Sequence, residues 1–207
     1  MTAPSRILLL GVGNILWADE GFGVRCVEAF AERFETPEFV TILDGGTQGL
    51  LLIDPIREHD RVILFDAVDF GGTPAQLSVV RDEAIPAFVG ARAMSLHQTG
   101  MTDVLSLAAL LGWKPESATL IGVQPVVLED YGGSLTPDVR LRVEEALDIA
   151  AAELQSWGVP ITRRSVPLRG DTVITSALSI DFYEAGRPSA EDACRFGDER
   201  VLVRSAA

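Results

Sequence analysis

The stretch RILLLGVGNILWADE (residues 6–20) joins a continuous apolar run to a glycine-bearing loop that ends in two adjacent acids. An uninterrupted apolar run is typical of a parallel strand covered on both faces, which we expect from Arg6 to Val12. After the loop, apolar residues recur at helical spacing: Val24, Val27, Phe30, Ala31 and Phe34. Charged residues occupy the other side of this helix: Arg25, Glu28, Glu32 and Arg33. The stretch therefore predicts a strand–loop–helix unit.

The same alternation continues to about residue 160. Further apolar runs predict strands at residues 39–43, 61–65, 76–80 and 119–123. Helical patterns predict helices over residues 47–58, 102–111 and 137–157, whereas residues 84–96 have neither pattern and are expected to form an irregular loop. Such alternation indicates an α/β fold. We expect a three-layer sandwich, in which a largely parallel twisted sheet of about five strands lies between helices, with a C-terminal extension.

Composition excludes several classes of partner. The chain has 207 residues, with 30 acidic and 17 basic side chains and a net charge of −13. This charge argues against nucleic acid or an anionic membrane as the partner. The apolar run at residues 7–12 is far too short to span a bilayer, and no cleavage pattern of a signal peptide follows it. With only two cysteines, no disulfide framework is expected, and we expect a cytoplasmic protein.

Charge divides the chain into two unequal parts. The negative balance falls within residues 1–160, whereas residues 161–207 contain seven basic and seven acidic side chains. The second part also lacks a long periodic apolar pattern. We therefore expect an α/β domain over residues 1–160 and a C-terminal extension of unknown role over residues 161–207. Truncation after about residue 162 is expected to leave a stable domain.

Three candidate functional residues follow from the topology. Right-handed crossovers place the loops after parallel strands along one edge of the sheet, where α/β proteins bind their ligands. Glu20 follows the first strand, Asp66 ends the third, and His97 lies between the irregular loop and a helix. Two carboxylates and one imidazole suit a borderline divalent cation such as Zn²⁺ or Ni²⁺. The neighbouring Asp19 is expected to cap the first helix.

Other chemistries fit these residues less well. The GVG of the first loop suggests a dinucleotide site, but Leu16 stands where the third glycine belongs, and the acids that follow would repel a pyrophosphate. A catalytic triad of Ser95, His97 and Asp66 would lack the G-x-S-x-G turn that exposes a nucleophilic serine. Neither cysteine has the electropositive surroundings of a nucleophilic thiol.

Five motifs occur in order and at fitting intervals: GVGNILWADEGFGV, LDGGTQG, an aspartate that ends the third strand, SLHQTG and LIGVQP. Over about residues 5–160 the chain resembles the hydrogenase maturation endopeptidases, which remove a C-terminal peptide from the large subunit of nickel–iron hydrogenases once the metal centre has been loaded. The resemblance implies a twisted sheet between helices. It places the family's metal-binding trio on Glu20, Asp66 and His97, and the substrate-facing turn on Asp44, Gly45, Gly46 and Thr47.

The resemblance also implies that the nickel is carried by the large-subunit precursor. The three ligands would pin this nickel and so place the scissile bond. A metal-bound water and a carboxylate general base both fit the activation of water, so no catalytic residue is assigned. Two other functions stay open: a self-contained zinc hydrolase, and a nickel-dependent hydrogenase maturation chaperone that binds the precursor without cutting it.

Overall fold

The computed structural model describes residues 4–82, 84–85, 96–128 and 130–187, with the backbone alone at residues 96–100 and 102–103. Its strands are β1 (Ile7–Val12), β2 (Phe34–Glu35), β3 (Val40–Gly46), β4 (Arg61–Ala67), β5 (Leu77–Arg81), β6 (Ser117–Val123) and β7 (Thr162–Arg163). Its α-helices are α1 (Phe22–Arg33), α2 (Ile53–Arg57), α4 (Leu96–Leu110), α5 (Pro137–Ser156) and α6 (Ile180–Gly186). Its short 3-10 turns are η1 (Ala18–Gly21), η2 (Gly49–Leu52) and η3 (Ser176–Leu178).

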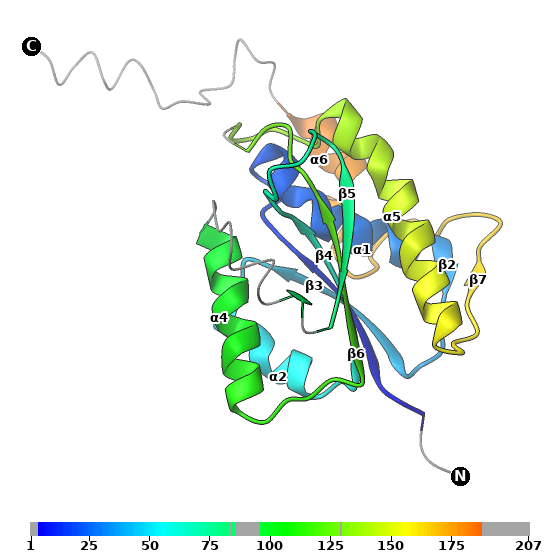
Figure 1. Cartoon of the computed structure of the whole chain (residues 1–207). Helices are drawn as coiled ribbons and strands as arrows, with labels where there is room; N and C mark the ends of the chain where they lie inside the picture. The colour runs from blue at the N-terminus through cyan, green and yellow to red at the C-terminus, as the bar shows by residue number, and fades with distance from the viewer. Residues whose placement is uncertain (1–3, 83, 86–95, 129, 188–207) are drawn as a thin grey trace, which may run out of the picture.

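Five strands form the main sheet in the order β3-β1-β4-β6-β5. The first four pair in parallel, whereas β5 runs antiparallel to β6. Helices α1 and α5 cover one face of the sheet, and α2 and α4 cover the other (Figure 1). The expected three-layer α/β fold around a largely parallel, five-stranded sheet is therefore confirmed. In the described ranges, no helix has the length and apolar character needed to cross a membrane.

Alternate side chains of β1 enter two separate cores. Leu8 and Leu10 pack on the side of α2 and α4, whereas Ile7 and Leu9 pack on the side of α1 and α5. Both faces are buried, which explains why this strand is continuously apolar instead of alternating. The apolar face expected on α5 is buried as well: Val139, Val143, Ala146, Leu147, Ala150 and Leu154.

Three boundaries differ from the sequence-based expectations. The helix expected over residues 47–58 is a 3-10 turn followed by the short α2, whose first turn contains Pro55. A proline is tolerated there because the first-turn N–H groups have no partner inside the helix. Strand β3 continues through residues 44–46, with a shift of register against β1. Helix α4 begins at Leu96, earlier than expected. The expected loop before it lies mostly outside the described residues.

The C-terminal extension packs against the α/β domain as far as residue 187. Strand β7 pairs antiparallel with β2, and the side chain of Ile174 is buried. The extension also covers the charged side of α1, so that Arg25 and Glu28 are only 4% and 3% exposed. This packing differs from the expectation of a separate segment. The extension shows no periodic pattern because it crosses the domain in turns and very short elements.

An ion pair ties the edge strand β5 to α5. The carboxylate of Glu153 accepts hydrogen bonds from Nε and Nη2 of Arg81 (3.2 and 2.9 Å) and from Oγ1 of Thr119 (2.8 Å). The hydrogen bond from Arg81 is the largest of the causes that lower the pKa of Glu153 below its ordinary 4.5, against the opposing effect of burial. The ionised form of Glu153 is therefore favoured by folding.

Glu153→Gln is expected to lower the free energy of unfolding by about 1–2 kcal/mol at neutral pH, since Arg81 is half exposed and the pair is partly screened. A carboxyl whose pKa is lowered by folding stabilises the protein above its unfolded-state pKa, and this contribution is lost as the pH falls through the folded-state pKa. Urea unfolding should therefore show the difference between wild type and variant shrinking below pH 4.5. Glu145→Gln, which breaks an exposed pair, is the control. A difference that is independent of pH would contradict this account.

Candidate functional site

Two glycines let α1 approach the carboxyl ends of β1 and β4. A Cβ atom at Gly23 would lie 2.2 Å from the carbonyl oxygen of Phe65 and 2.3 Å from that of Val12. A Cβ atom at Gly11 would lie 2.2 Å from the carbonyl oxygen of Gly23. Only a residue without a side chain fits such a backbone contact. This close approach holds η1, the turn that carries Glu20, in contact with β4.

Glu20 and Asp66 come together at this edge of the sheet. Asp66 lies near the end of β4 and is 3% exposed, whereas Glu20 is partly exposed. Burial raises the pKa of Asp66 well above its ordinary 3.8; a hydrogen bond from the backbone of Ala67 lowers it, and the negative charge of Glu20 raises it. A carboxylate that is both buried and repelled by a second carboxylate is stabilised by a proton or by a bound cation.

The turn at residues 44–47 borders the same edge. The N–H of Gly13 donates a hydrogen bond to the carbonyl oxygen of Gly46 (3.0 Å), which joins the loop after β1 to the turn. The Asp44 carboxylate accepts a hydrogen bond from the Gly46 N–H (2.9 Å), and Gly46 has a φ of 44°, a conformation that favours glycine. Burial raises the pKa of Asp44, while this hydrogen bond and the charge of Arg25 lower it.

His97 lies in the first turn of α4, which corrects the expectation that it precedes the helix. Its side chain lies outside the described residues. The second histidine, His59, precedes β4 at the opposite edge of the sheet, where Nδ1 lies 2.6 Å from the carbonyl oxygen of Pro55. His59 is therefore too far away to join the two carboxylates, and an imidazole at this site would have to come from His97.

Two of the three residues expected as metal ligands, Glu20 and Asp66, have described side chains, and both lie at this edge of the sheet. Within the described part of the chain, no group of three His, Cys, Asp or Glu side chains could hold a metal ion. The third ligand, His97, stays a prediction. Cys26 is fully buried, and burial raises the pKa of its thiol, which fits a packing role. Cys194 lies outside the described residues. The described arrangement therefore offers a carboxylate pair whose negative charge a cation could offset.

Sequence reasoning assigned a wrong role to Asp19. This side chain is fully buried, and its carboxylate accepts hydrogen bonds from the N–H groups of Val126 and Val127 (both 2.9 Å) and from the N–H and hydroxyl of Thr136 (2.7 and 3.1 Å). The N-terminus of α1 receives no side-chain hydrogen bond. Asp19, which directly precedes Glu20, therefore anchors the loop between β6 and α5.

Gln124 is a second residue of this edge that sequence reasoning missed. Its Oε1 accepts hydrogen bonds from the N–H groups of Phe70 (3.0 Å) and Gly72 (3.1 Å), and its Nε2 donates to Asp69 (3.0 Å). Gln124 thus fixes the loop that follows Asp66. The sequence did contain a signal for this role, because Gln124 is a polar residue that directly follows an apolar strand within the LIGVQP motif.

A sequence model of the family described as hydrogenase maturation protease matches residues 24–153. The hydrogenase expression/formation protein HupD of Rhodobacter capsulatus is 51% identical over 203 residues, which cover 98% of this chain and 96% of that protein. The chain belongs to the hydrogenase maturation protease family. It is accordingly a peptidase, and the edge of the sheet described above is the candidate active site of such a protease.

Solved structures of hydrogenase maturation proteases share the fold. The hydrogenase maturating endopeptidase HybD from Escherichia coli matches with a TM-score of 0.73 at 43% identity, over 77% of this chain and 98% of that one. The [NiFe] hydrogenase maturation protease HybD from Thermococcus kodakarensis matches with a TM-score of 0.60 at 26% identity, over 72% of this chain and 98% of that one. The part of this chain that HybD from E. coli leaves unmatched is similar in size to residues 161–207.

Asp19→Asn is expected to lower the free energy of unfolding of this hydrogenase maturation protease by about 2–4 kcal/mol. The amide group would turn a donor toward backbone N–H groups that now share a buried carboxylate. Urea unfolding at neutral pH measures the loss. Asp138→Asn removes an exposed acid from the first turn of α5 and serves as the control, with an expected loss below about 1 kcal/mol. Equal stability of the two variants would contradict the role assigned to Asp19.

Proposed function

We propose that this hydrogenase maturation protease removes the C-terminal peptide of the large-subunit precursor of a nickel–iron hydrogenase after nickel has been loaded. Nickel is then part of the substrate. Glu20, Asp66 and His97 engage it, and the turn at residues 44–47 faces the peptide. The observation that carries the proposal is the buried Asp66 carboxylate beside Glu20 at the carboxyl edge of the sheet, in a chain of the protease family.

The reaction is the hydrolysis of one peptide bond. The oxygen of water forms a bond to the scissile carbonyl carbon, the C–N bond breaks, and the leaving amine takes up a proton. The role of the three ligands is to hold the nickel of the precursor, and hence the peptide next to it, at a constant position. Correct placement of the reacting groups accounts for a large part of enzymatic rate enhancement.

The ligand set supports weak binding of free nickel. Two carboxylates and one imidazole include no thiolate, the ligand that holds soft and borderline metals tightly. Catalytic zinc sites use three protein ligands, most often with at least two histidines or cysteines, and His97 is the one histidine available at this edge. Weak binding suits an enzyme that must release its product with the nickel retained. We therefore expect the isolated protease to bind nickel weakly and to leave a nickel-free precursor intact.

Incubation of the purified protease with nickel-loaded and nickel-free precursor tests the proposal. The loaded precursor should be cleaved and the nickel-free precursor should stay intact. Addition of EDTA should leave cleavage unchanged, because the nickel is already held by the precursor. Glu20→Gln, Asp66→Asn and His97→Ala should each lower the cleavage rate by about 100-fold or more. His59→Ala, at the opposite edge, is the matched control and should cleave normally.

The same experiment separates the other functions. A self-contained zinc hydrolase would contain stoichiometric zinc, lose activity in EDTA and cut the nickel-free precursor. A maturation chaperone would bind the loaded precursor and leave its length unchanged, as mass spectrometry would report. Either result would overturn the proposed reaction.

A further inference from the structure

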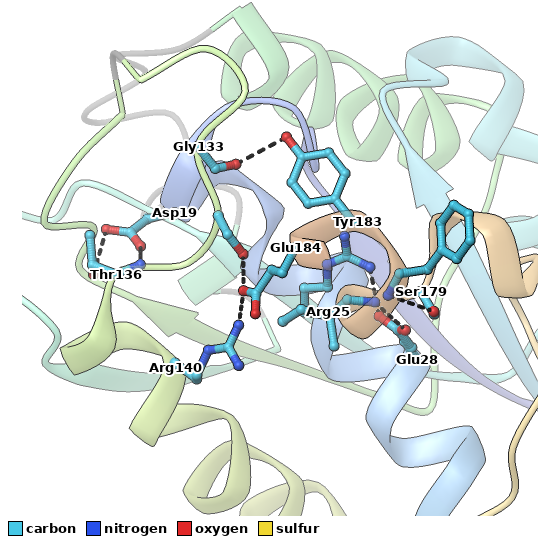
Figure 2. Close-up of polar contacts among 12 residues, drawn as sticks. Asp19, Arg25, Glu28, Gly133, Thr136, Arg140, Ser179, Tyr183 and Glu184 are labelled. Carbon is cyan, nitrogen blue, oxygen red and sulfur yellow. Dashed lines mark hydrogen bonds and ion pairs between the residues drawn. The ribbon is translucent and has the colours of Figure 1, made fainter. Parts of the chain in front are cut away.

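Residues 171–186, here called the strap, lie across the buried charged side of α1. Nη1 of Arg25 donates hydrogen bonds to the carbonyl oxygen of Leu178 (2.7 Å) and to Glu28 (2.8 Å). The N–H of Ile180 donates to the other carboxylate oxygen of Glu28 (2.9 Å). The guanidinium carbon of Arg25 lies 5.6 Å from the centre of the Tyr183 ring. Figure 2 shows the two side chains. The strap thus shields Arg25 and Glu28 from water and supplies each of them with a hydrogen-bond partner in place of water.

The strap also contacts the loop that leads from β6 into α5. The hydroxyl of Tyr183 donates to the carbonyl oxygen of Gly133 (3.2 Å), and the hydroxyl of Ser134 donates to Glu184 (2.6 Å). Glu184 forms an ion pair with Arg140 in α5 as well (Figure 2). The carboxylate of Glu184 therefore joins the loop and the following helix at a single point.

A short series of contacts leads from this point to the candidate active site. Thr136, two residues after Ser134, donates its N–H and its hydroxyl to Asp19 (Figure 2). The N–H of Asp19 donates to the carbonyl oxygen of Val127 in the same loop (3.2 Å). Asp19 is the residue before Glu20. A displacement of the loop would therefore move the backbone that carries Glu20.

The strap also bears on the substrate-facing turn. The positive charge of Arg25 acts on Asp44, where it lowers the pKa of the carboxyl. Arg25 is 4% exposed because the strap covers it, so this charge is screened little by water. The strap therefore contacts elements on both sides of the candidate active site, the loop beside Glu20 and the helix beside Asp44.

We propose that Glu184 is a positioning residue of the candidate active site: by holding Ser134 and Arg140 together, it fixes the loop that Asp19 binds, and so fixes Glu20 against Asp66. The strap then contributes to the function of the site by positioning Glu20. Relatives such as HupD of Rhodobacter capsulatus, matched over 98% of this chain, span it too. As far as it concerns cleavage, this inference rests on the proposed function.

Glu184→Ala is the variant that tests the proposal, with Asp181→Ala as its matched control. Asp181 is an exposed acid of the same short helix, so both variants lose one negative charge and one side chain. Glu184 is about one-third exposed (32% of its side chain), and we expect both variants to fold. Ser134→Ala removes the same contact from the loop side. The double variant should lose no more than Glu184→Ala alone, because Glu184→Ala already removes the hydrogen bond that Ser134→Ala removes.

Hydrogen exchange of the amides of Asp19, Glu20, Val127 and Thr136 provides the first measurement and needs no substrate. Exchange at these positions should be about tenfold faster in Glu184→Ala and unchanged in Asp181→Ala. Cleavage of the nickel-loaded precursor provides the second. At a temperature well below the Tm, kcat of Glu184→Ala should fall about tenfold while its KM changes less than twofold. The peptide still binds, but the position of its nickel at the site varies more.

The outcomes are distinct. Unchanged exchange at all four amides would overturn the inference, whether or not the wild type cleaves a precursor. A lower Tm for Glu184→Ala with unchanged kcat would overturn it too, because the strap would then stabilise the fold without positioning Glu20. If the wild type fails to cleave the loaded precursor, the proposed function fails, and the exchange measurement still decides whether Glu184 fixes the loop.

Discussion

Gly23→Ala is expected to lower the free energy of unfolding by about 3 kcal/mol and to reduce cleavage of the nickel-loaded precursor by about 100-fold. The added Cβ would lie 2.2 Å from the carbonyl oxygen of Phe65 and 2.3 Å from that of Val12. Both are backbone atoms of central strands, so the helix itself must move. Because α1 follows directly after η1, its displacement carries Glu20 away from Asp66.

Urea unfolding and precursor cleavage, measured side by side, check both parts of this prediction. Gly186→Ala is the control, because a Cβ atom at Gly186 meets no atom within 4 Å and a side chain is tolerated there. We expect the control to equal the wild type in stability and rate. A Gly23→Ala protein with wild-type stability and activity would show that the backbone contact is not what places Glu20.

The fold could be predicted because its signals are local. Strand β1 is buried on both faces, so its six residues form an unbroken apolar run, and the helical spacing after it follows from one buried face. The parallel topology then places Glu20 and Asp66 at the same edge by the handedness of the crossovers. The start of α4 was missed because Thr99 and Gly100 are poor helix formers.

The parts that could not be predicted depend on distant contacts. Asp19 was expected to cap a neighbouring helix, but its hydrogen-bond partners lie 107 to 117 residues away. Arg25 and Glu28 occupy the charged side of an amphipathic helix, and their burial depends on a segment that lies some 150 positions later. Periodicity reports which side of a helix is apolar. It carries no information about a later segment that covers the polar side.

Ending the chain at Thr162 is expected to lower the Tm by about 10 °C, although composition alone suggests that the extension is dispensable. The truncation removes Ile174, which is buried, and Val173 and Ile180, which pack against the core on the α1 and α5 side of the sheet. A buried aliphatic side chain stabilises a protein by about 1.5–3 kcal/mol, and part of this is offset by the chain entropy regained. A net loss of about 3 kcal/mol corresponds to roughly 10 °C at this chain length.

The buried ion pair between Arg25 and Glu28 also loses contacts in the truncated protein. Without the strap, Arg25 and Glu28 lose the carbonyl oxygen of Leu178 and the N–H of Ile180, and the charged side of α1 meets water.

Differential scanning calorimetry measures the Tm of the truncated protein. A second truncation, after Arg187, retains the strap and separates its contribution from that of residues 188–207. HybD from E. coli keeps the fold in a shorter chain, so the truncated protein should retain its secondary structure by circular dichroism. A truncated protein that melts at the wild-type temperature would mean that the contacts on Arg25 and Glu28 contribute no stability, because water then solvates both side chains equally well.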